Sequence, residues 1–103
     1  MGTKVYSGSV KEFIAGNNVD KFTESTDVSV KAGQVFKRNG KIIGLVVNDV
    51  DINEDNEPRP VSVLTSGAVY HNMLDATDAE KKELLANTEV YFRDEFTPAK
   101  DGN

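Results

Sequence analysis

The segment that decides the fold is 32–74, which reads AGQVFKRNGKIIGLVVNDVDINEDNEPRPVSVLTSGAVYHNML. Two strand-like runs, VFKR and KIIG, flank Asn39-Gly40. This dipeptide is the preferred two-residue loop of a type I′ β-hairpin, because both residues tolerate positive φ. The segment therefore predicts a β-hairpin, and the short alternating runs around it predict a mainly β domain.

The loop length also predicts the register of this hairpin. A two-residue loop sets Arg38 opposite Lys41, where like charges slightly oppose each other beside the turn. It sets Phe36 opposite Ile43, which gives an apolar cross-strand pair. Gly44 interrupts the second strand and indicates a bulge.

The residues after the hairpin alternate between apolar runs and polar breaks. Residues 45–47 are apolar on both strand faces, which is typical of a strand buried on both sides. Residues 48–60 carry five acids and two prolines and are expected to form an exposed loop. Residues 61–64 alternate again as a strand, 65–67 predict a turn, and the strand is expected to resume at 68–70.

One helix is expected near the C-terminus. Thr77 and Glu80 fit a capping box, in which each side chain bonds to the backbone N–H of the other residue. Asn87 is the expected C-cap, and residues 90–92 alternate as a closing strand. An earlier strand is expected at 27–30.

These patterns predict five to seven short strands and one short C-terminal helix, in a compact small β-barrel or β-sandwich-like domain. Residues 1–27 are expected to form an N-terminal arm or a partly ordered extension. Residues 28–96 form the expected β-rich domain, and residues 97–103 a flexible tail.

Composition excludes several classes of protein. The chain has 103 residues, no cysteine and a net charge of −5. Without cysteine there is neither a disulfide framework nor a thiolate zinc site. The acidic balance argues against a nucleic-acid partner, which needs a basic face. No apolar run approaches the roughly 20 residues that cross a bilayer, so we expect no membrane partner.

The sequence offers little catalytic machinery. His71 is the only histidine, and no serine lies in a G-x-S-x-G elbow. The glycines form neither a dinucleotide-binding pattern nor a P-loop. We therefore expect His71 to be an ordinary surface or interface residue, and we expect no enzyme activity and no cofactor.

The acidic loop is the one serious candidate for a metal site. Oxygen-bearing side chains at alternate positions imitate the first half of an EF-hand loop, namely Asp49, Asp51, Asn53 and Asp55. The sixth position, however, is Glu54 instead of glycine, and the twelfth is Pro60 instead of glutamate. The prediction is a solvated loop, and a weak divalent site is the alternative.

The order of elements resembles that of phage head decoration proteins. The resemblance covers residues 28–95 and rests on short motifs: KAGQVF, GLVVNDVD, PVSVLTSGAV, LDATDAEKKELLA and VYFRDE. Small phage head-fibre proteins share a similar layout. The residues before position 28 match no pattern of this family.

The resemblance implies a β-rich structural protein on the outside of an icosahedral capsid, assembled in the cytoplasm of a bacterial host. It implies a homotrimer that binds the major capsid protein and joins neighbouring capsid subunits. By hypothesis the shell contacts lie in the N-terminal arm, at Val5, Tyr6, Val10, Phe13 and Ile14; the alternative for each is internal packing. Deleting the first 15 residues is then expected to abolish capsid binding and to leave a folded domain.

Two other classes of protein stay open. One is a small acidic β-barrel module that binds a basic partner through the loop, with an affinity that falls as salt rises. The other is a metal-dependent enzyme built on the loop carboxylates. It predicts a tight divalent site.

Overall fold

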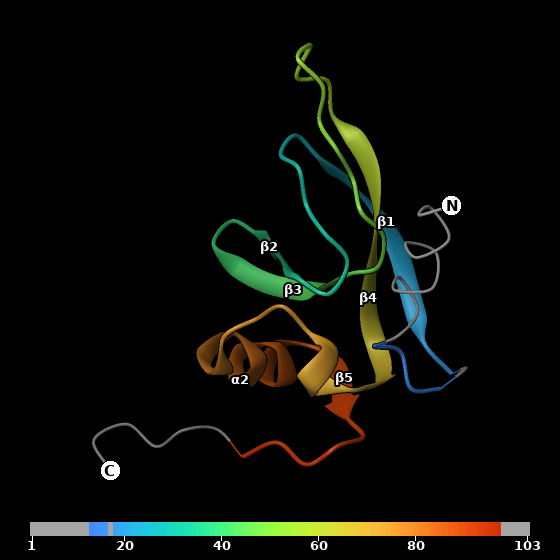
Figure 1. The fold of residues 1–103 in the computed structure, drawn as a ribbon, viewed down its shortest axis with the longest axis vertical. Coiled ribbons are helices and arrows are strands. Elements are labelled where there is room, and N and C mark those ends of the chain that lie inside the picture. The colour runs from blue at the N-terminus through green and yellow to red at the C-terminus, as the bar shows by residue number, and fades with distance from the viewer. Residues whose placement is uncertain (1–12, 17, 98–103) are drawn as a thin grey trace, which may run out of the picture.

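A computed structural model of the protein describes residues 13–16 and 18–97 (Figure 1). It has a sheet with the strands β1 (Asp20–Thr26), β2 (Val35–Arg38), β3 (Lys41–Val46), β4 (Arg59–Val69) and β5 (Glu89–Phe92). A short 3₁₀-helix, η1 (His71–Met73), and one α-helix, α2 (Asp78–Asn87), lie between β4 and β5. The expected mainly β domain with one helix is confirmed, but the sheet is open and does not close into a barrel.

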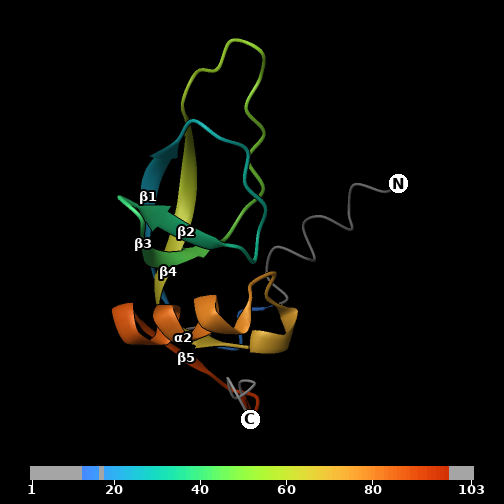
Figure 2. The same cartoon turned by 90° about the vertical axis from the view of Figure 1, so that its left-hand side faces the viewer.

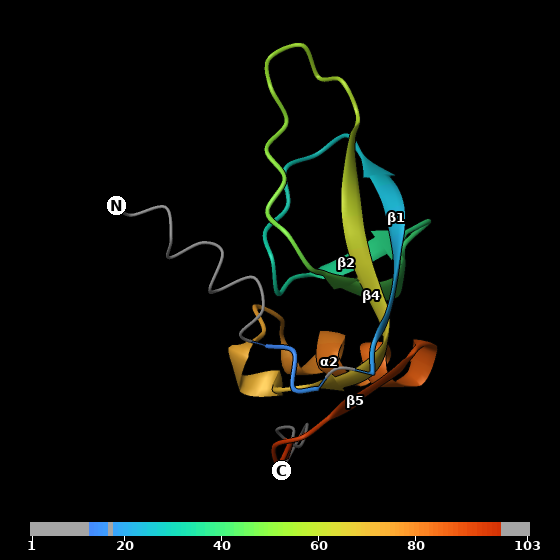
Figure 3. The same ribbon diagram turned by 90° about the vertical axis from the view of Figure 1, so that its right-hand side faces the viewer.

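Strand β4 organises the sheet, because β1, β3 and β5 all pair with it. β1 runs antiparallel to β4 over residues 59–66, and β3 pairs antiparallel through Leu45 and Val46. β5 runs parallel to residues 66–69 of β4, and α2 forms the crossover between the two strands. Figures 2 and 3 show the loop between β3 and β4 at one end of the molecule and α2 and β5 at the other.

The strand β1 was not predicted. Its seven residues, DKFTEST, all have partners on β4, although the sequence analysis assigned residues 1–27 to an arm. Most of its side chains are exposed, so this strand is held by backbone pairing more than by an apolar face. The sheet therefore begins at Asp20 instead of after residue 27.

The β2–β3 hairpin has the predicted turn, but its pairing register shifts farther from the turn. Asn39 and Gly40 have φ values of 55° and 80°, and Arg38 pairs with Lys41. Phe36 pairs with Gly44 instead of Ile43, because a bulge falls between Phe36 and Lys37 in the register. The bulge that Gly44 indicated is thus present, and it breaks the expected Phe36–Ile43 pair.

Two other local predictions need correction. Residues 65–67 do not turn the chain, because β4 continues through Gly67, which has a φ of 125°. A Cβ on Gly67 would lie 2.5 Å from a methyl carbon of Val19, so this close approach excludes a side chain. The strand expected at 27–30 is reduced to one bridge between Val30 and Val50.

The core has two parts, one on each side of β3 and β4. The first cluster lies against α2 and contains Phe13, Ile42, Leu45, Val47, Leu64, Val69, Leu74, Leu84 and Val90. The second contains Phe36, Val46, Val50, Val61 and Val63. Neighbouring residues of β3, Leu45 and Val46, enter different clusters, as alternate strand positions must. The prediction that residues 45–47 are buried on both faces is confirmed.

An ion pair links two of the edge strands of this open sheet, β1 and β2. The guanidinium of Arg38, at the end of β2, contacts the carboxylate of Glu24 on β1. The same guanidinium donates to the backbone oxygen of Ser25 at 3.5 Å. The sheet is therefore curled enough to bring β1 and β2 together by side chains without a backbone ladder between them.

Candidate interaction surface

The residues predicted to contact the capsid fall into two groups. Val5, Tyr6 and Val10 lie outside the described residues. Phe13 is only 2% exposed and belongs to the core cluster beside α2, and Ile14 pairs with β4 and packs on the same cluster. The alternative reading, internal packing, therefore holds for Phe13 and Ile14 in the isolated chain, and Phe13 is not available as a contact residue.

A different set of large side chains is exposed at the end of β4. Tyr91 on β5 is 55% exposed, Met73 in η1 is 46% exposed, and Tyr70 between β4 and η1 is 39% exposed. All three lie on or beside the last residues of β4, because β5 pairs with residues 66–69 and η1 follows directly. Aromatic and methionine side chains are enriched in protein–protein interfaces. Sequence reasoning missed these residues, since their exposure depends on which strand faces are covered.

The side chains of β5 divide cleanly between two faces of the sheet. Val90 is buried in the cluster beside α2, and Phe92 packs against the same cluster. Alternation therefore places Glu89, Tyr91 and Arg93 on the opposite face, and all three are exposed. This face of β5 is an acid, an aromatic ring and a base in a row.

His71 is held by contacts to both ring nitrogens. Nε2 lies 2.7 Å from the backbone oxygen of Glu95, and Nδ1 lies 3.1 Å from Nζ of Lys81. A carbonyl oxygen only accepts and an ammonium only donates, so Nε2 carries the proton and Nδ1 accepts. The ring also contacts Phe92 and Phe96, at centroid distances of 5.3 and 4.9 Å. With both nitrogens engaged, this imidazole fastens the segment after β5 to the domain.

Asp94 fixes the same corner from the other side. Its carboxylate accepts from the backbone N–H groups of His71 and Asn72 at 2.9 and 3.2 Å. Burial acts to raise the pKa of Asp94, but hydrogen bonds from backbone N–H groups outweigh it, and the pKa is lowered. The carboxylate thus anchors η1, which carries Met73.

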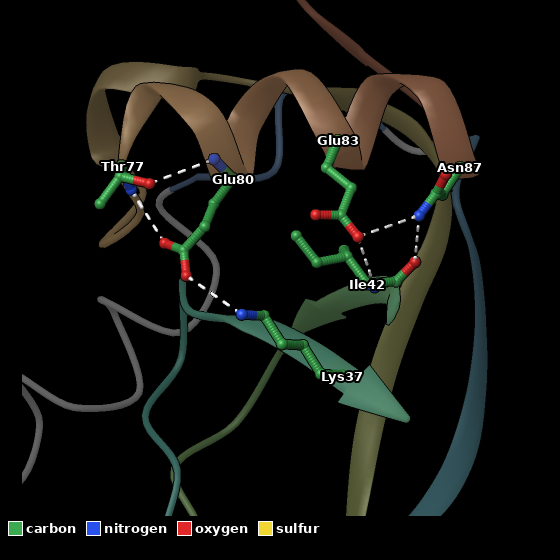
Figure 4. A network of polar contacts seen from close by, with 6 residues as sticks. All are labelled: Lys37, Ile42, Thr77, Glu80, Glu83 and Asn87. Carbon is green, nitrogen blue, oxygen red and sulfur yellow. Dashed lines mark hydrogen bonds and ion pairs between the residues drawn. The ribbon is translucent and has the colours of Figure 1, made fainter. Parts of the chain in front are cut away.

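The start of α2 is fastened to the hairpin by polar contacts (Figure 4). Thr77 Oγ1 accepts from the Glu80 N–H at 3.1 Å, and Glu80 Oε1 accepts from the Thr77 N–H at 2.9 Å. The expected capping box is therefore confirmed. The other carboxylate oxygen of Glu80 lies 3.8 Å from Nζ of Lys37 on β2.

The end of α2 is fastened to β3 in the same view (Figure 4). Glu83 accepts from the backbone N–H of Ile42 at 3.1 Å, and the Asn87 amide donates to the Ile42 oxygen at 3.0 Å. Asn87 is the last residue of the helix, and Thr88 takes the C-cap position expected for Asn87. These bonds satisfy backbone groups of β3 that have no strand beside them.

A polar hollow of about 410 Å³ lies where β3, β4 and β5 meet. It is lined by Asp20, Ile43, Thr65, Ser66, Ala86, Asn87, Thr88 and Glu89. The lining contains two carboxylates and no imidazole or basic side chain.

The acidic loop is organised by its own hydrogen bonds. Asp49 Oδ1 accepts from the Ala32 N–H at 2.8 Å, and Asp55 Oδ1 accepts from the Glu57 N–H at 3.1 Å. Two of the carboxylates in the EF-hand-like pattern therefore serve backbone N–H groups. Across residues 13–16 and 18–97, no group of three or more acidic, histidine or cysteine side chains is arranged to hold a metal.

No helix within the described part of the chain is long and apolar enough to span a bilayer. Comparisons of the chain with models of known protein families, with curated proteins and with solved structures all return no match.

Proposed function

We propose that this protein is a structural virion protein that binds the outside of an icosahedral phage capsid and stabilises it by bridging major capsid subunits. The observation that carries the proposal is the exposed set Tyr70, Met73 and Tyr91 at one end of β4. These residues lie in the segment whose element order resembles that of phage decoration proteins. Large apolar side chains in water gain free energy when two protein surfaces meet.

The construction of this end suits binding without rearrangement. η1 is anchored by Asp94, and α2 is tied at both ends to the β2–β3 hairpin. A contact surface that is already ordered loses less conformational entropy on binding. Many identical subunits, each bound modestly to a repeating shell, then hold neighbouring capsid subunits together through avidity.

The test is co-sedimentation with emptied capsids of the phage that encodes the chain. Replacing Tyr70 and Met73 by serine should weaken binding by roughly tenfold or more, since each substitution removes apolar area from the contact. Val28→Ser is the matched control, because Val28 is 61% exposed but lies away from this end. Binding that is unchanged by the double substitution, or absent in the unmodified protein, would overturn the proposal.

The N-terminal contact residues need a differently placed truncation. Deleting the first 15 residues would remove Phe13 and Ile14, which pack in the core. Deleting residues 1–12 removes Val5, Tyr6 and Val10 and keeps both. If that shorter truncation folds and no longer binds capsids, these three residues contribute to the shell contact; unchanged binding restricts the contact to the end of β4.

A second candidate function is a small module that binds a basic partner protein. The observation that favours it is the loop 51–58, which holds four acids and no basic residue and is exposed along almost its whole length. Attraction of this kind is screened by salt. Replacing Glu54 and Glu57 by lysine would abolish binding to such a partner and would leave capsid binding unchanged.

A further inference from the structure

β5 lies at the margin of the sheet and has one neighbour, β4. Figures 2 and 3 show no described strand on its outer side. The N–H of Arg93 donates to the Val69 oxygen on β4. Alternate residues of a strand direct their backbone groups to the same neighbouring strand, so the backbone groups of Tyr91 also point toward β4. The backbone groups of Val90 and Phe92 therefore point outward.

These outward groups are mostly unpaired. The Val90 N–H has an acceptor in the Thr88 hydroxyl at 3.1 Å. The carbonyl of Val90 and both backbone groups of Phe92 have no hydrogen bond to another described residue. An edge of this kind is a template for a further strand.

The side chains of β5 indicate which strand would fit. Glu89 and Arg93 carry opposite charges on either side of Tyr91, on the face away from α2. Neither the Glu89 carboxylate nor the Arg93 guanidinium has an ion-pair or hydrogen-bond partner among the described residues. In an antiparallel copy of the same strand the order of the charges is reversed, so the acid of each copy faces the base of the other. The row Glu89, Tyr91 and Arg93 is therefore complementary to a second copy of itself.

We propose that β5 pairs antiparallel with β5 of a second copy of the chain, across a two-fold axis at Tyr91. In this register Tyr91 lies opposite Tyr91 of the second copy, and Val90 lies opposite Phe92. Glu89 lies opposite Arg93, and symmetry repeats that pair on the other side of the axis. A two-fold contact of this kind closes on itself and does not propagate into a filament.

The backbone geometry agrees with the same register. Val90 and Phe92 point their backbone groups outward, so they form the hydrogen-bonded pairs of the new ladder. Tyr91, Glu89 and Arg93 then occupy the non-hydrogen-bonded positions, where facing side chains approach most closely. One register therefore satisfies the unpaired backbone groups, stacks an aromatic pair and joins two opposite charges twice.

The other edge strands lack this complementarity. An antiparallel pair of β1 strands centred on Phe22 sets Asp20 opposite Glu24, and one centred on Thr23 pairs no opposite charges. β2 carries Lys37 and Arg38 and no acid, so two copies of β2 repel each other. Neither β1 in these two registers nor β2 offers the two opposite-charge pairs that β5 offers.

This contact goes beyond the proposed capsid role and does not depend on it. It joins two subunits in free solution through β5 and takes Tyr91 from the exposed set named above, whereas the capsid-binding test changes only Tyr70 and Met73. The three-fold contact that the family resemblance implies would use another face. Failure to bind capsids and failure to pair through β5 are therefore separate results.

Cysteine cross-linking of the full-length chain tests the axis directly. The chain has no cysteine, so Tyr91→Cys introduces one thiol per copy. At a non-hydrogen-bonded pair the Cα atoms lie about 4.5 Å apart, within the range that a disulfide spans. Oxidation should convert most of the protein to a covalent dimer, whereas Tyr70→Cys, a matched control on an exposed tyrosine, should not. An oxidised Tyr91→Cys protein that stays monomeric would overturn the proposal.

Charge reversal tests the register. Glu89→Arg or Arg93→Glu alone sets like charges opposite each other twice, and should weaken dimerisation in sedimentation equilibrium by roughly tenfold or more. The double reversal restores opposite charges, and should recover the original dissociation constant within about threefold. Thermal melts check that each variant is folded. Single and double variants that dimerise equally, or an unmodified chain that stays monomeric at high concentration, would contradict the assignment.

Discussion

Replacing Phe13 by alanine should destabilise the isolated protein strongly. Phe13 is 2% exposed and packs in the cluster that joins β4, β5 and α2. A buried phenylalanine truncated to alanine loses about 3–5 kcal/mol, because the transfer free energy of the ring and the cost of the cavity add. In a domain of about this size 1 kcal/mol lowers Tm by about 4–8 °C, so the smaller loss corresponds to a fall of about 12–24 °C.

Urea unfolding followed by far-UV circular dichroism measures this change, with no capsid or other partner present. The control is Phe22→Ala, because Phe22 is a phenylalanine in β1 with 39% of its surface exposed. It should lose no more than about half as much free energy of unfolding. If the Phe13→Ala protein unfolds at the same urea concentration as the unmodified chain, Phe13 does not pack in the core and the burial argument fails.

Three further changes probe other parts of the fold. Gly44→Ala should lower the free energy of unfolding, measured in urea, by about 1–3 kcal/mol, because the new Cβ would lie 2.6 Å from the backbone oxygen of Leu64 on β4. Gly16→Ala is the control and should leave this free energy unchanged, because the space around Gly16 is open. Thr77→Ala should lower the free energy of unfolding in thermal melts by about 0.5–2 kcal/mol, because it removes the N-cap of α2. Thr77→Ser keeps the capping hydroxyl and should retain most of that stability. Asp94 has a lowered pKa, so it stabilises the fold fully above the unfolded value of about 3.9, and this contribution is lost as the pH falls through the lower folded value. Asp94→Asn should therefore unfold more easily at pH 7 and show a flatter stability profile below about pH 4, and equal slopes for both proteins would contradict this.

Local signals in the sequence predicted local structure well. Asn39-Gly40 gave the turn because few residue pairs accept positive φ twice, and Thr77 with Glu80 gave the helix start. The pairing of Phe36 failed, since a bulge depends on how closely β3 approaches β4 at Gly44. Gly44 indicated a bulge, but the pairing that results depends on residues far apart in the chain.

Strand β1 and the candidate surface could not be predicted for the same reason. The run DKFTEST has no apolar alternation, because its stability comes from the backbone of β4. Likewise, the pattern around Tyr91 predicts a strand but not its place at the margin of the sheet. Phe13 was expected in the N-terminal arm as a shell-contact residue, yet the structure uses it in the core.

The position of β4 has a practical consequence for attaching other proteins to this one. The Phe13 oxygen accepts from the Tyr70 N–H at 2.8 Å, and the Arg93 N–H donates to the Val69 oxygen at 2.8 Å. The first and last parts of the described chain are therefore tethered to Val69, the last residue of β4, and to the residue that follows it, at the end of the molecule opposite the acidic loop (Figure 3). A linker could join those two ends, and new termini could be opened within the acidic loop. A protein fused to such a circularly permuted chain would be displayed at the loop end of the molecule, and every strand would keep its place.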